Sequence, residues 1–317
     1  MNNLSEIALV LREKDNFIII PHKNPDGDCL GSSVALLLGL RDIGKTAYIS
    51  LPNNPGERLS FLWDESYRAP EGFACDVCIA VDVAAGYMMD RLKEEIFDKA
   101  PFTVCLDHHG TNKGIADMNF IDASASAAGE VIYRLLLELK CIVSKDIASA
   151  LYSAIASDTG SFRYSNTTSD TLKISAELVG LGIDSAKIMR ILFETKSIAQ
   201  TKIMSDIIDN MEFYFDNKVC ITYCNEQMLS KYNLTFDDVD EYSTLPRTIK
   251  GVEVGVFLKC YSEHETKASL RSNEYADVSQ VAASLGGGGH IRAAGVTINS
   301  DLVTAKQVLL GKLEELF

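Results

Sequence analysis

The first half of the chain alternates short apolar runs with segments of helical character. The apolar runs are rich in Ile, Val and Cys and cover residues 17–21, 46–51, 76–82 and 102–107. Runs without polar alternation are typical of strands in a parallel sheet that is covered on both faces. A helical pattern follows the first run at 29–40, and residues 124–210 are mostly helical in pattern. This alternation predicts a doubly wound α/β domain with a parallel sheet.

The pattern changes after about residue 212. Strand candidates in this part cover residues 213–215, 219–223, 252–261 and 267–271, with helical patterns between and after them. We therefore expect a smaller α/β domain with a mixed sheet. The predicted organisation is a first domain at 1–194, a helical connector at 195–212 and a second domain at 213–317, which fits a length of 317 residues.

Charge and composition narrow the range of partners. Acidic residues outnumber basic ones by 44 to 30, and the net charge is -14. Long duplex nucleic acid is therefore not expected as the main partner, since such binding needs many contacts between Lys or Arg and phosphates. A short anionic substrate held by a few cations remains compatible with this charge. No apolar run reaches about 20 residues and the first residues lack a signal-peptide pattern, so we expect a cytoplasmic protein without a membrane partner.

The eight cysteines are expected to be buried free thiols of a protein in a reducing compartment. Most lie inside the apolar runs. Cys75 and Cys78 match a C-x-x-C spacing, but no second pair lies at a spacing typical of zinc sites. We therefore assign them no metal or redox role.

Three apolar runs of the first half end in acidic residues or histidines. Because the carboxyl ends of parallel strands meet at one edge of a sheet, side chains that are distant in sequence are expected to converge there. One further aspartate follows the helical pattern at 145–156. The candidate ligands are His22, Asp26, Asp28, Asp82, His108 and Asp158.

Six ligands exceed what one catalytic zinc ion takes from a protein, and they suffice for two divalent ions that share a carboxylate. Mixed carboxylate and imidazole ligands suit a metal such as Mn²⁺. Taken singly, each residue also has a structural interpretation. Asp28, for example, is placed to cap the helix expected at 29–40.

The motifs resemble those of the DHH phosphoesterase superfamily. They read His22-x-x-x-Asp26-x-Asp28, Val81-Asp82, Asp107-His108-His109 and Ser157-Asp158-Thr-Gly. The segment Gly286-Gly-Gly-Gly-His290-Ile-Arg-Ala-Ala-Gly295 resembles the glycine-rich signature of the DHHA1 substrate domain. The motifs occur in order along nearly the whole chain, which is most similar to the nanoRNase/pAp-phosphatase group of DHH–DHHA1 proteins.

The resemblance implies how these residues divide their roles. His22, Asp26 and Asp82 would hold one ion of the catalytic domain. Asp28, Asp82, His108 and Asp158 would hold a second ion, with Asp82 bridging. Asp107 would orient a ligand, and His109 would face the substrate as a hydrogen-bond donor or proton carrier, so both are assigned to catalysis.

The resemblance also implies a substrate-binding set in the second domain. Gly287, Gly288 and Gly289 would offer backbone N–H groups to phosphate, and His290 would add a side-chain donor. Arg271, followed by Ser272, resembles the family arginine that binds a terminal phosphate through two hydrogen bonds. Further candidates for the substrate are Arg292, Arg163 and Asn112.

The implied activity is that of a Mn²⁺-dependent, two-metal phosphohydrolase, which the family resemblance suggests is a homodimer. It would degrade very short oligoribonucleotides to nucleoside 5'-monophosphates and dephosphorylate pAp to AMP. A first alternative is a phosphodiesterase for linear or cyclic dinucleotides such as pApA or c-di-AMP. A family II pyrophosphatase would carry a Ser-Arg-Lys-Lys type motif in place of the glycine run. The alternative from another class is a nucleotide-sensing binding protein, against which the complete set of ligands argues.

Overall fold

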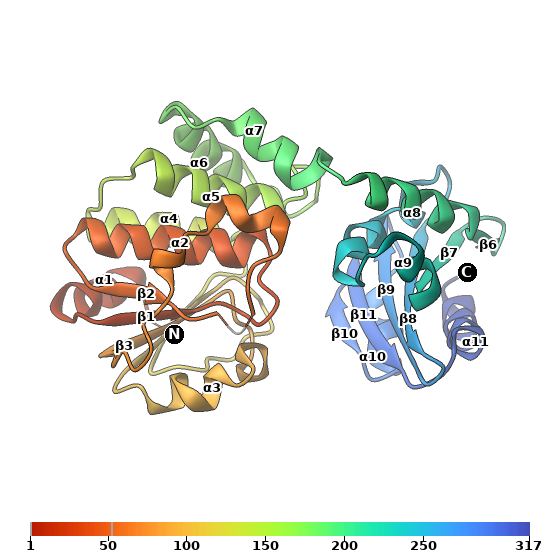
Figure 1. Cartoon of the computed structure of the whole chain (residues 1–317), viewed down its shortest axis with the longest axis horizontal. Coiled ribbons are helices and arrows are strands. Elements are labelled where there is room, and N and C mark those ends of the chain that lie inside the picture. Colours follow the sequence, from red (N-terminus) through yellow and green to blue (C-terminus); the bar gives the residue numbers. More distant parts are fainter. Residues whose placement is uncertain (1, 52) are drawn as a thin grey trace. The chain divides into compact units, whose positions relative to one another are not determined.

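The structure is a computed structural model that describes residues 2–51 and 53–317. The chain divides into two compact units, Met1–Thr195 and Lys196–Phe317, which are drawn in Figure 1 from red to green and from green to blue. Each unit has its own sheet and its own buried core. The boundary lies at the start of the segment expected as a connector, and α8 within that segment packs Ile203 and Ile207 into a core of the second unit.

The sheet of unit 1 is parallel throughout, as the apolar runs predicted. Its order is β2-β1-β3-β4-β5. The strands are β1 (Phe17–Ile20), β2 (Ala47–Ile49), β3 (Val77–Val81), β4 (Thr103–Asp107) and β5 (Met118–Ile121). Along β1, Phe17 and Ile19 point into the larger core, whereas Ile18 and Ile20 point into a smaller core on the opposite face. Both faces are covered, which explains why the strands lack polar alternation.

Helices cover the two faces unequally (Figure 1). The face with the larger core is packed mainly by α1, α2, α4 and α5, whereas α3 covers the other face. The helices of unit 1 are α1 (Leu4–Glu13), α2 (Gly27–Asp42), α3 (Leu92–Glu95), α4 (Ala128–Leu139), α5 (Lys145–Asp158), α6 (Ser169–Gly180) and α7 (Ser185–Met189). Short 3-10 segments cover Glu57–Leu62, Glu65–Tyr67, Gly86–Met89 and Phe97–Lys99, and a π-type turn covers Arg190–Glu194.

Unit 2 has a mixed sheet of order β10-β11-β9-β8-β7-β6, in which only the pair β7 and β8 is parallel. Its strands are β6 (Glu212–Tyr214), β7 (Val219–Asn225), β8 (Val254–Ser262), β9 (Glu265–Ser272), β10 (Gly288–His290) and β11 (Ala293–Ile298). Its helices are α8 (Ile198–Asp209), α9 (Glu226–Tyr232), α10 (Val278–Ser284) and α11 (Leu302–Leu313), with 3-10 segments at Asp237–Thr244, Pro246–Thr248 and Glu314–Leu316. The mixed sheet that the sequence predicted is confirmed.

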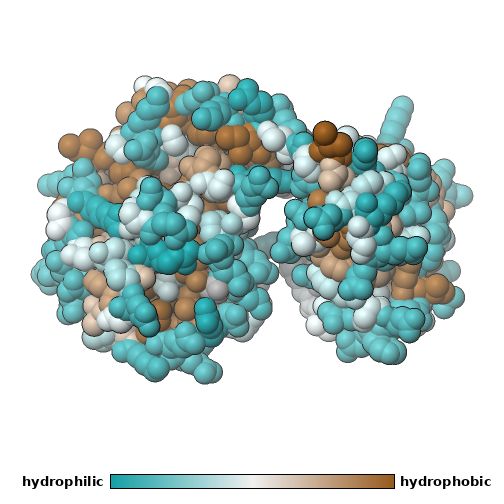
Figure 2. Space-filling view, in the orientation of Figure 1, coloured by the Kyte–Doolittle hydropathy of each residue, from teal (hydrophilic) through white to brown (hydrophobic). Residues whose placement is uncertain are grey.

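The surface agrees with the acidic composition. Figure 2 shows a largely hydrophilic face on which apolar side chains form separate patches. Among the described residues, no helix combines the length and the apolar character that a membrane crossing requires.

Close packing of α2 on α5 decides where the acidic residues of unit 1 meet. A Cβ atom at Gly31 of α2 would lie 2.5 Å from the backbone oxygen of Ala150 in α5. The two backbones therefore approach as closely as glycine permits. This contact places the first turn of α2 beside the last turns of α5, where Gly27 lies against Ser157.

We expect Gly31→Ala to destabilise unit 1 by about 1–3 kcal/mol, because the added methyl group meets backbone that cannot swing aside. Helix propensity alone would give the opposite sign, a gain of roughly 0.5–1 kcal/mol. Urea unfolding followed by circular dichroism measures the difference. Gly180→Ala is the matched control, since nothing lies within 4 Å of a Cβ atom at this helical glycine. Equal unfolding midpoints for the two variants would contradict the packing argument.

Candidate metal centre

All six predicted metal ligands lie together at the carboxyl edge of the parallel sheet in unit 1. His22 follows β1, Asp82 follows β3 and His108 follows β4. The Nε2 atom of His22 lies 3.7 Å from Oδ2 of Asp82 and 3.8 Å from Oδ1 of Asp26. The predicted convergence of strand ends therefore holds for residues that are up to about ninety positions apart.

A second group surrounds His108. Its Nε2 atom lies 3.5 Å from Oδ1 of Asp82, 3.7 Å from Oδ2 of Asp28 and 3.7 Å from Oδ2 of Asp158. The two carboxylate oxygens of Asp82 thus face different histidines, one in each group. This is the arrangement that a bridging carboxylate requires.

Asp82 shows two signs of a functional constraint. Its φ angle is +59°, in the left-handed region that residues with side chains rarely adopt, and its side chain is buried. Its Oδ1 atom has no hydrogen-bond partner among the residues that the structure describes. A buried carboxylate oxygen without a partner is costly in free energy, and a bound cation would supply the missing interaction.

The crowding of carboxylates perturbs their protonation. Burial and the neighbouring charge of Asp82 raise the pKa of Asp28 well above its ordinary value. Burial, together with nearby carboxylates, raises the pKa of Asp158 to about 7. Burial opposes the charging of His108, but its contact with Asp82 and the charges of Asp28 and Asp158 raise its pKa to about 11. A site that holds protons this tightly is one where a divalent cation can replace them.

Helix starts fix the two aspartates of the first motif. The helix α2 begins at Gly27, and its N-cap is Asp26, whose Oδ1 accepts a hydrogen bond from the N–H of Cys29 at 2.9 Å. The expectation that Asp28 caps this helix was wrong, because the helix begins before it. Asp28 lies in the first turn, and its two oxygens accept hydrogen bonds from backbone N–H groups of Ala128 and Gly129 at the start of α4.

The sequence interpretation assigned no role at the site to Cys29. Its Sγ atom accepts a hydrogen bond from the N–H of His22 at 3.1 Å and belongs to the same potential ligand group as His22 and Asp82. Burial and the adjacent carboxylates raise the pKa of the thiol well above its ordinary value, so it stays protonated and is a poor metal ligand. Its contribution is to hold the backbone of His22. The position directly after Asp28 in the motif was the available signal.

All eight cysteines are free thiols, and all except Cys75 are buried, as expected.

Asp107 is completely buried and holds His109. Its Oδ1 atom lies 2.8 Å from Nδ1 of His109 and accepts the backbone N–H of His108 at the same distance. Burial opposes ionisation of Asp107, but its bond to His109 lowers its pKa below the ordinary value. Burial likewise opposes the charging of His109, but Asp107 raises its pKa above the ordinary value. The pair thus keeps an orientated imidazole that readily carries a proton.

Asn112 is in a different environment from the one expected of a substrate-binding residue. It is buried, and its Nδ2 atom donates to Oδ2 of Asp107 at 2.7 Å and to the backbone oxygen of Val83 at 3.0 Å. Its Oδ1 atom accepts the N–H of Gly114 at 2.8 Å. Since the amide is fully engaged, Asn112 holds Asp107 in place rather than facing a ligand.

In unit 2, Arg271 and His290 belong to one row across the sheet. Arg271 of β9 pairs with Ala293 of β11, which pairs with His290 of β10. Residues in one row of a sheet point to the same face. Between the side chains of Arg271 and His290 lies only that of Ala293, which is small. The register thus gives the two predicted phosphate-binding side chains a common direction.

The glycine run is partly a strand, although the sequence suggested a loop. A Cβ atom at Gly287 would lie 2.3 Å from the backbone oxygen of Gly295, and one at Gly289 would lie 2.5 Å from that of Ala293. These two glycines are therefore required by close approach to β11. Gly288 is exposed and has no atom within 4 Å of the position of a Cβ atom, so its backbone is the more accessible one.

The other predicted substrate residues make contacts with backbone. Arg292 donates to the carbonyl groups of Ala276, at 2.8 Å, and Glu274. The N–H of the buried Ser272 donates to the carbonyl of Arg292 at 3.1 Å, which fastens the end of β9 to the hairpin turn. Arg163 donates through Nε to the carbonyl of Gly160 at 2.6 Å. Ser272 and Arg292 thus hold the hairpin that carries His290.

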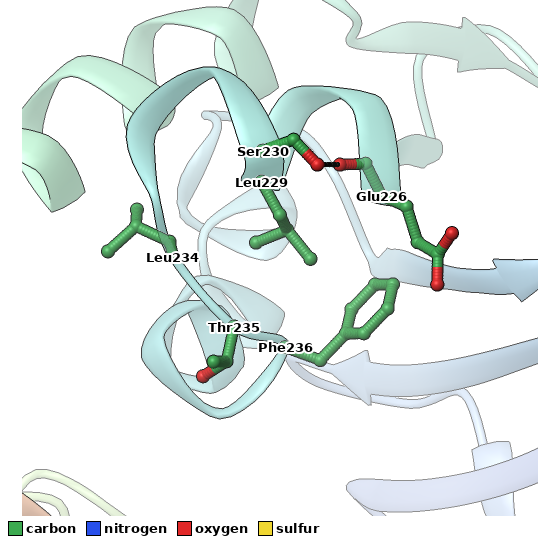
Figure 3. A pocket seen from close by; sticks show the side chains of 6 residues that line it. All are labelled: Glu226, Leu229, Ser230, Leu234, Thr235 and Phe236. Carbon is green, nitrogen blue, oxygen red and sulfur yellow. Dashed lines mark hydrogen bonds between the residues drawn. The ribbon is translucent and has the colours of Figure 1, made fainter.

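One surface pocket lies elsewhere in unit 2, along α9 and the turn that follows it. Figure 3 shows its lining, in which the hydroxyl of Ser230 donates to the backbone of Glu226. None of the predicted site residues belongs to it; its lining consists of Glu226, Leu229, Ser230, Leu234, Thr235 and Phe236. It has no basic side chain and no potential metal group, so it does not compete with the acidic cluster as the candidate site.

We expect Mn²⁺ to raise the melting temperature of the protein, because a bound cation offsets the repulsion among Asp28, Asp82 and Asp158. At a concentration about 100 times the dissociation constant, the gain for one site is about 2.7 kcal/mol. Asp82→Asn tests this, since asparagine tolerates the same backbone conformation but lacks the charge. In EDTA the variant should melt at or above the wild-type temperature, and its gain on adding Mn²⁺ should be clearly smaller. Equal gains in differential scanning fluorimetry would show that the cluster is not where the ion binds.

Two family models match this chain. The model described as "DHH family, N-terminal domain" matches residues 16–155, and the model described as "DHHA1 domain" matches residues 216–317. The bifunctional oligoribonuclease and PAP phosphatase NrnA of Thermus thermophilus is 31% identical, over 98% of this chain and 93% of its own length. The protein of the same description from Bacillus subtilis is 27% identical, and the match covers 93% of each.

A solved structure shows the same fold. An exopolyphosphatase-related protein from Bacteroides fragilis has a TM-score of 0.91 and 24% sequence identity, covering 98% of this chain and 96% of that chain. This confirms the expected two α/β parts. Since both family models match in the expected order and a relative spanning nearly the whole chain exceeds 30% identity, the protein belongs to the DHH–DHHA1 family of phosphoesterases.

Proposed function

We propose that the protein is a metal-dependent phosphohydrolase that degrades very short oligoribonucleotides to nucleoside 5'-monophosphates and dephosphorylates pAp to AMP. The observation that carries this proposal is the complete acidic cluster, in which two histidines face opposite oxygens of one aspartate, Asp82. The full-length relatives named as oligoribonucleases and PAP phosphatases support the choice of substrate.

The donor set fits two divalent ions. His22, Asp26 and Asp82 would hold the first, and Asp28, Asp82, His108 and Asp158 the second. Oxygen and imidazole donors without a thiolate favour Mn²⁺ among the common metals, so we propose it as the native ion. Such ions, when bound, polarise the phosphoryl group and make a bound water acidic.

The chain's own proton carrier would be His109. Its Nδ1 atom is fixed on Asp107, which stabilises the imidazolium form, and Asn112 holds Asp107 from the other side. We propose that Nε2 of His109 donates a hydrogen bond to the phosphate or a proton to the leaving oxygen of the ester. A positioned acid of this kind contributes roughly 10²–10⁴ to a rate.

Unit 2 is proposed to bind the phosphate end of the substrate. Arg271 and His290 project from one face of the sheet. Gly288, whose backbone is exposed, lies two positions before His290 on β10. A guanidinium group suits a terminal phosphate because it can donate two parallel hydrogen bonds. Few cations are needed for a short anion, and the net charge of -14 disfavours long polymers. Arg163 remains a proposed further contact from unit 1.

Two alternatives remain as outcomes of the test. The same cluster is compatible with hydrolysis of pApA or c-di-AMP, because each presents a phosphodiester, as a short oligoribonucleotide does, whereas pAp presents a phosphomonoester. A protein that only senses nucleotides has no need of His109 held by a buried carboxylate. A homodimer is proposed on the family resemblance alone, and a cytoplasmic location on the sequence pattern described above.

The test is a product assay with Mn²⁺, run in parallel with EDTA. The panel is pAp, a labelled RNA trinucleotide, pApA, c-di-AMP, a long single-stranded RNA and pyrophosphate. We expect turnover of pAp and the trinucleotide that EDTA abolishes, with little turnover of the long RNA. Preferential turnover of pApA or c-di-AMP would replace the proposed substrates, and binding without turnover of any of them would favour the sensor.

His109→Ala should lower kcat on the trinucleotide by roughly 10²–10⁴, since it removes the proton carrier but none of the proposed metal ligands. The rise in melting temperature with Mn²⁺ should stay within error of the wild-type value. Steady-state kinetics and fluorimetry on the same preparation measure both. Wild-type kcat in this variant would remove His109 from the mechanism.

A further inference from the structure

The segment 125–129, between β5 and the first turn of α4, contacts the second potential ligand group. The N–H of Ala128 donates to Oδ2 of Asp28 at 2.7 Å, and the N–H of Gly129 donates to Oδ1 at 3.0 Å. N–H groups in the first turn of a helix have no partner within the helix, and the helix dipole favours a negative charge there. The start of α4 therefore orientates both oxygens of Asp28.

The same segment orientates His108. The carbonyl of Ala125 lies 3.3 Å from Nδ1 of His108. Because a carbonyl group can only accept, this contact favours a proton on Nδ1, so Nε2 is the atom that would offer its lone pair to an ion once the ion displaces its proton. Nε2 is the atom that lies nearest to Asp28, Asp82 and Asp158.

A third contact leads to Asp158. The Nδ2 atom of Asn166 donates to the carbonyl of Ser126 and to that of Asp158, each at 3.1 Å. The end of α5 is thereby tied to the segment that already holds Asp28 and His108. One stretch of backbone thus contacts three residues of the second group, directly or through one amide.

Glu130 holds this segment in place. Its side chain is buried, and its Oε1 atom accepts hydrogen bonds from the N–H of Ser126 at 3.2 Å, from the hydroxyl of Ser126, and from the hydroxyl of Thr171 at 2.6 Å. Its Oε2 atom accepts from Arg134 at 3.1 Å. A buried carboxylate is expensive in free energy unless it is paired in this way.

Glu130 is not itself a candidate ligand. It belongs to none of the potential metal groups found among the described residues. Its partners lie on the segment 125–129, on its own helix and on α6, so its charge is used to fix backbone and not to bind an ion.

We propose that Glu130 is a positioning residue of the metal centre: through the segment 125–129 it sets Asp28, His108 and Asp158 in the geometry that the second ion requires. This inference rests on the proposed function in so far as that function uses two ions. It concerns metal affinity, however, and so it can be tested apart from the reaction.

The test is Mn²⁺ binding by isothermal titration calorimetry, with the number of bound ions checked by electron paramagnetic resonance. Glu130→Gln keeps the size of the side chain but turns one acceptor into an amide that opposes Arg134. We expect the wild type to bind two ions, and the variant to bind one of them about 10–100-fold more weakly, as is typical when a group that orientates ligands is altered. Thr171→Val, which removes one donor, should give a smaller loss of affinity in the same site.

The matched control is Tyr133→Phe. Tyr133 also lies on α4, and its hydroxyl donates to Glu177 of α6 and not to the segment 125–129. We expect it to bind both ions with wild-type affinity, even if its melting temperature falls. If Glu130→Gln does not fold, Ser126→Ala and Thr171→Val replace it, and each should weaken one ion at least threefold.

The outcomes separate the two proposals. Wild-type affinity for both ions in Glu130→Gln and Thr171→Val, at whatever stability, would overturn the positioning role. A wild-type protein that binds two ions but hydrolyses neither pAp nor the trinucleotide would overturn the proposed function and leave the role of Glu130 intact. A wild-type protein that binds no divalent ion would overturn both.

Discussion

Repulsion among buried carboxylates at the carboxyl edge of the sheet is the constraint on which unit 1 depends. Asp28, Asp82 and Asp158 come from the start of a helix, the end of a strand and the end of another helix; the first two are buried and Asp158 is partly buried. The rest of the unit offsets this cost. The close contact of α2 with α5 fixes the positions of Asp28 and Asp158. The N–H groups at the start of α4 donate hydrogen bonds that stabilise the charge of Asp28. Among the described residues, Oδ1 of Asp82 has no hydrogen-bond donor, and a bound cation would supply the missing interaction.

The ligands at strand ends were predictable from a rule of topology. Parallel strands present their carboxyl ends at one edge, so His22, Asp82 and His108 had to approach one another once the apolar runs were identified as strands. Asp158 ends a helix and was a candidate because it follows the helical pattern at 145–156. Its position beside the strand ends depends on packing between α2 and α5, which no local pattern reveals. The contacts that orientate these ligands were not predictable. The Sγ atom of Cys29 accepts a hydrogen bond from the N–H of His22, seven positions earlier, and the amide of Asn112 donates to Asp107, five positions earlier. Both contacts depend on how the loop after a strand folds back, which residue types and spacing do not reveal.

In unit 2 the order of strands was less predictable than their existence. The glycine run was expected as a phosphate-binding loop, but the pairing of β10 with β11 makes two of its glycines necessary for strand contact. The direction of an arginine near a hairpin turn depends on the register of that hairpin. Arg271 shares a row with His290, whereas Arg292, at the turn, binds the carbonyl groups of a neighbouring loop. The local sequence around these two arginines does not reveal this difference in direction.

The left-handed backbone at Asp82 has a consequence for how this protein can change over evolutionary time. Asparagine or glycine would accept that conformation but would remove the charge, whereas glutamate would keep the charge but fit the backbone poorly. Of these residues, only aspartate combines the negative charge with this backbone conformation. None of the other three can therefore replace it and keep both properties. At most positions of a protein, some substitutions change function only gradually. A lineage that replaces this aspartate would lose the proposed bridging ligand in one step.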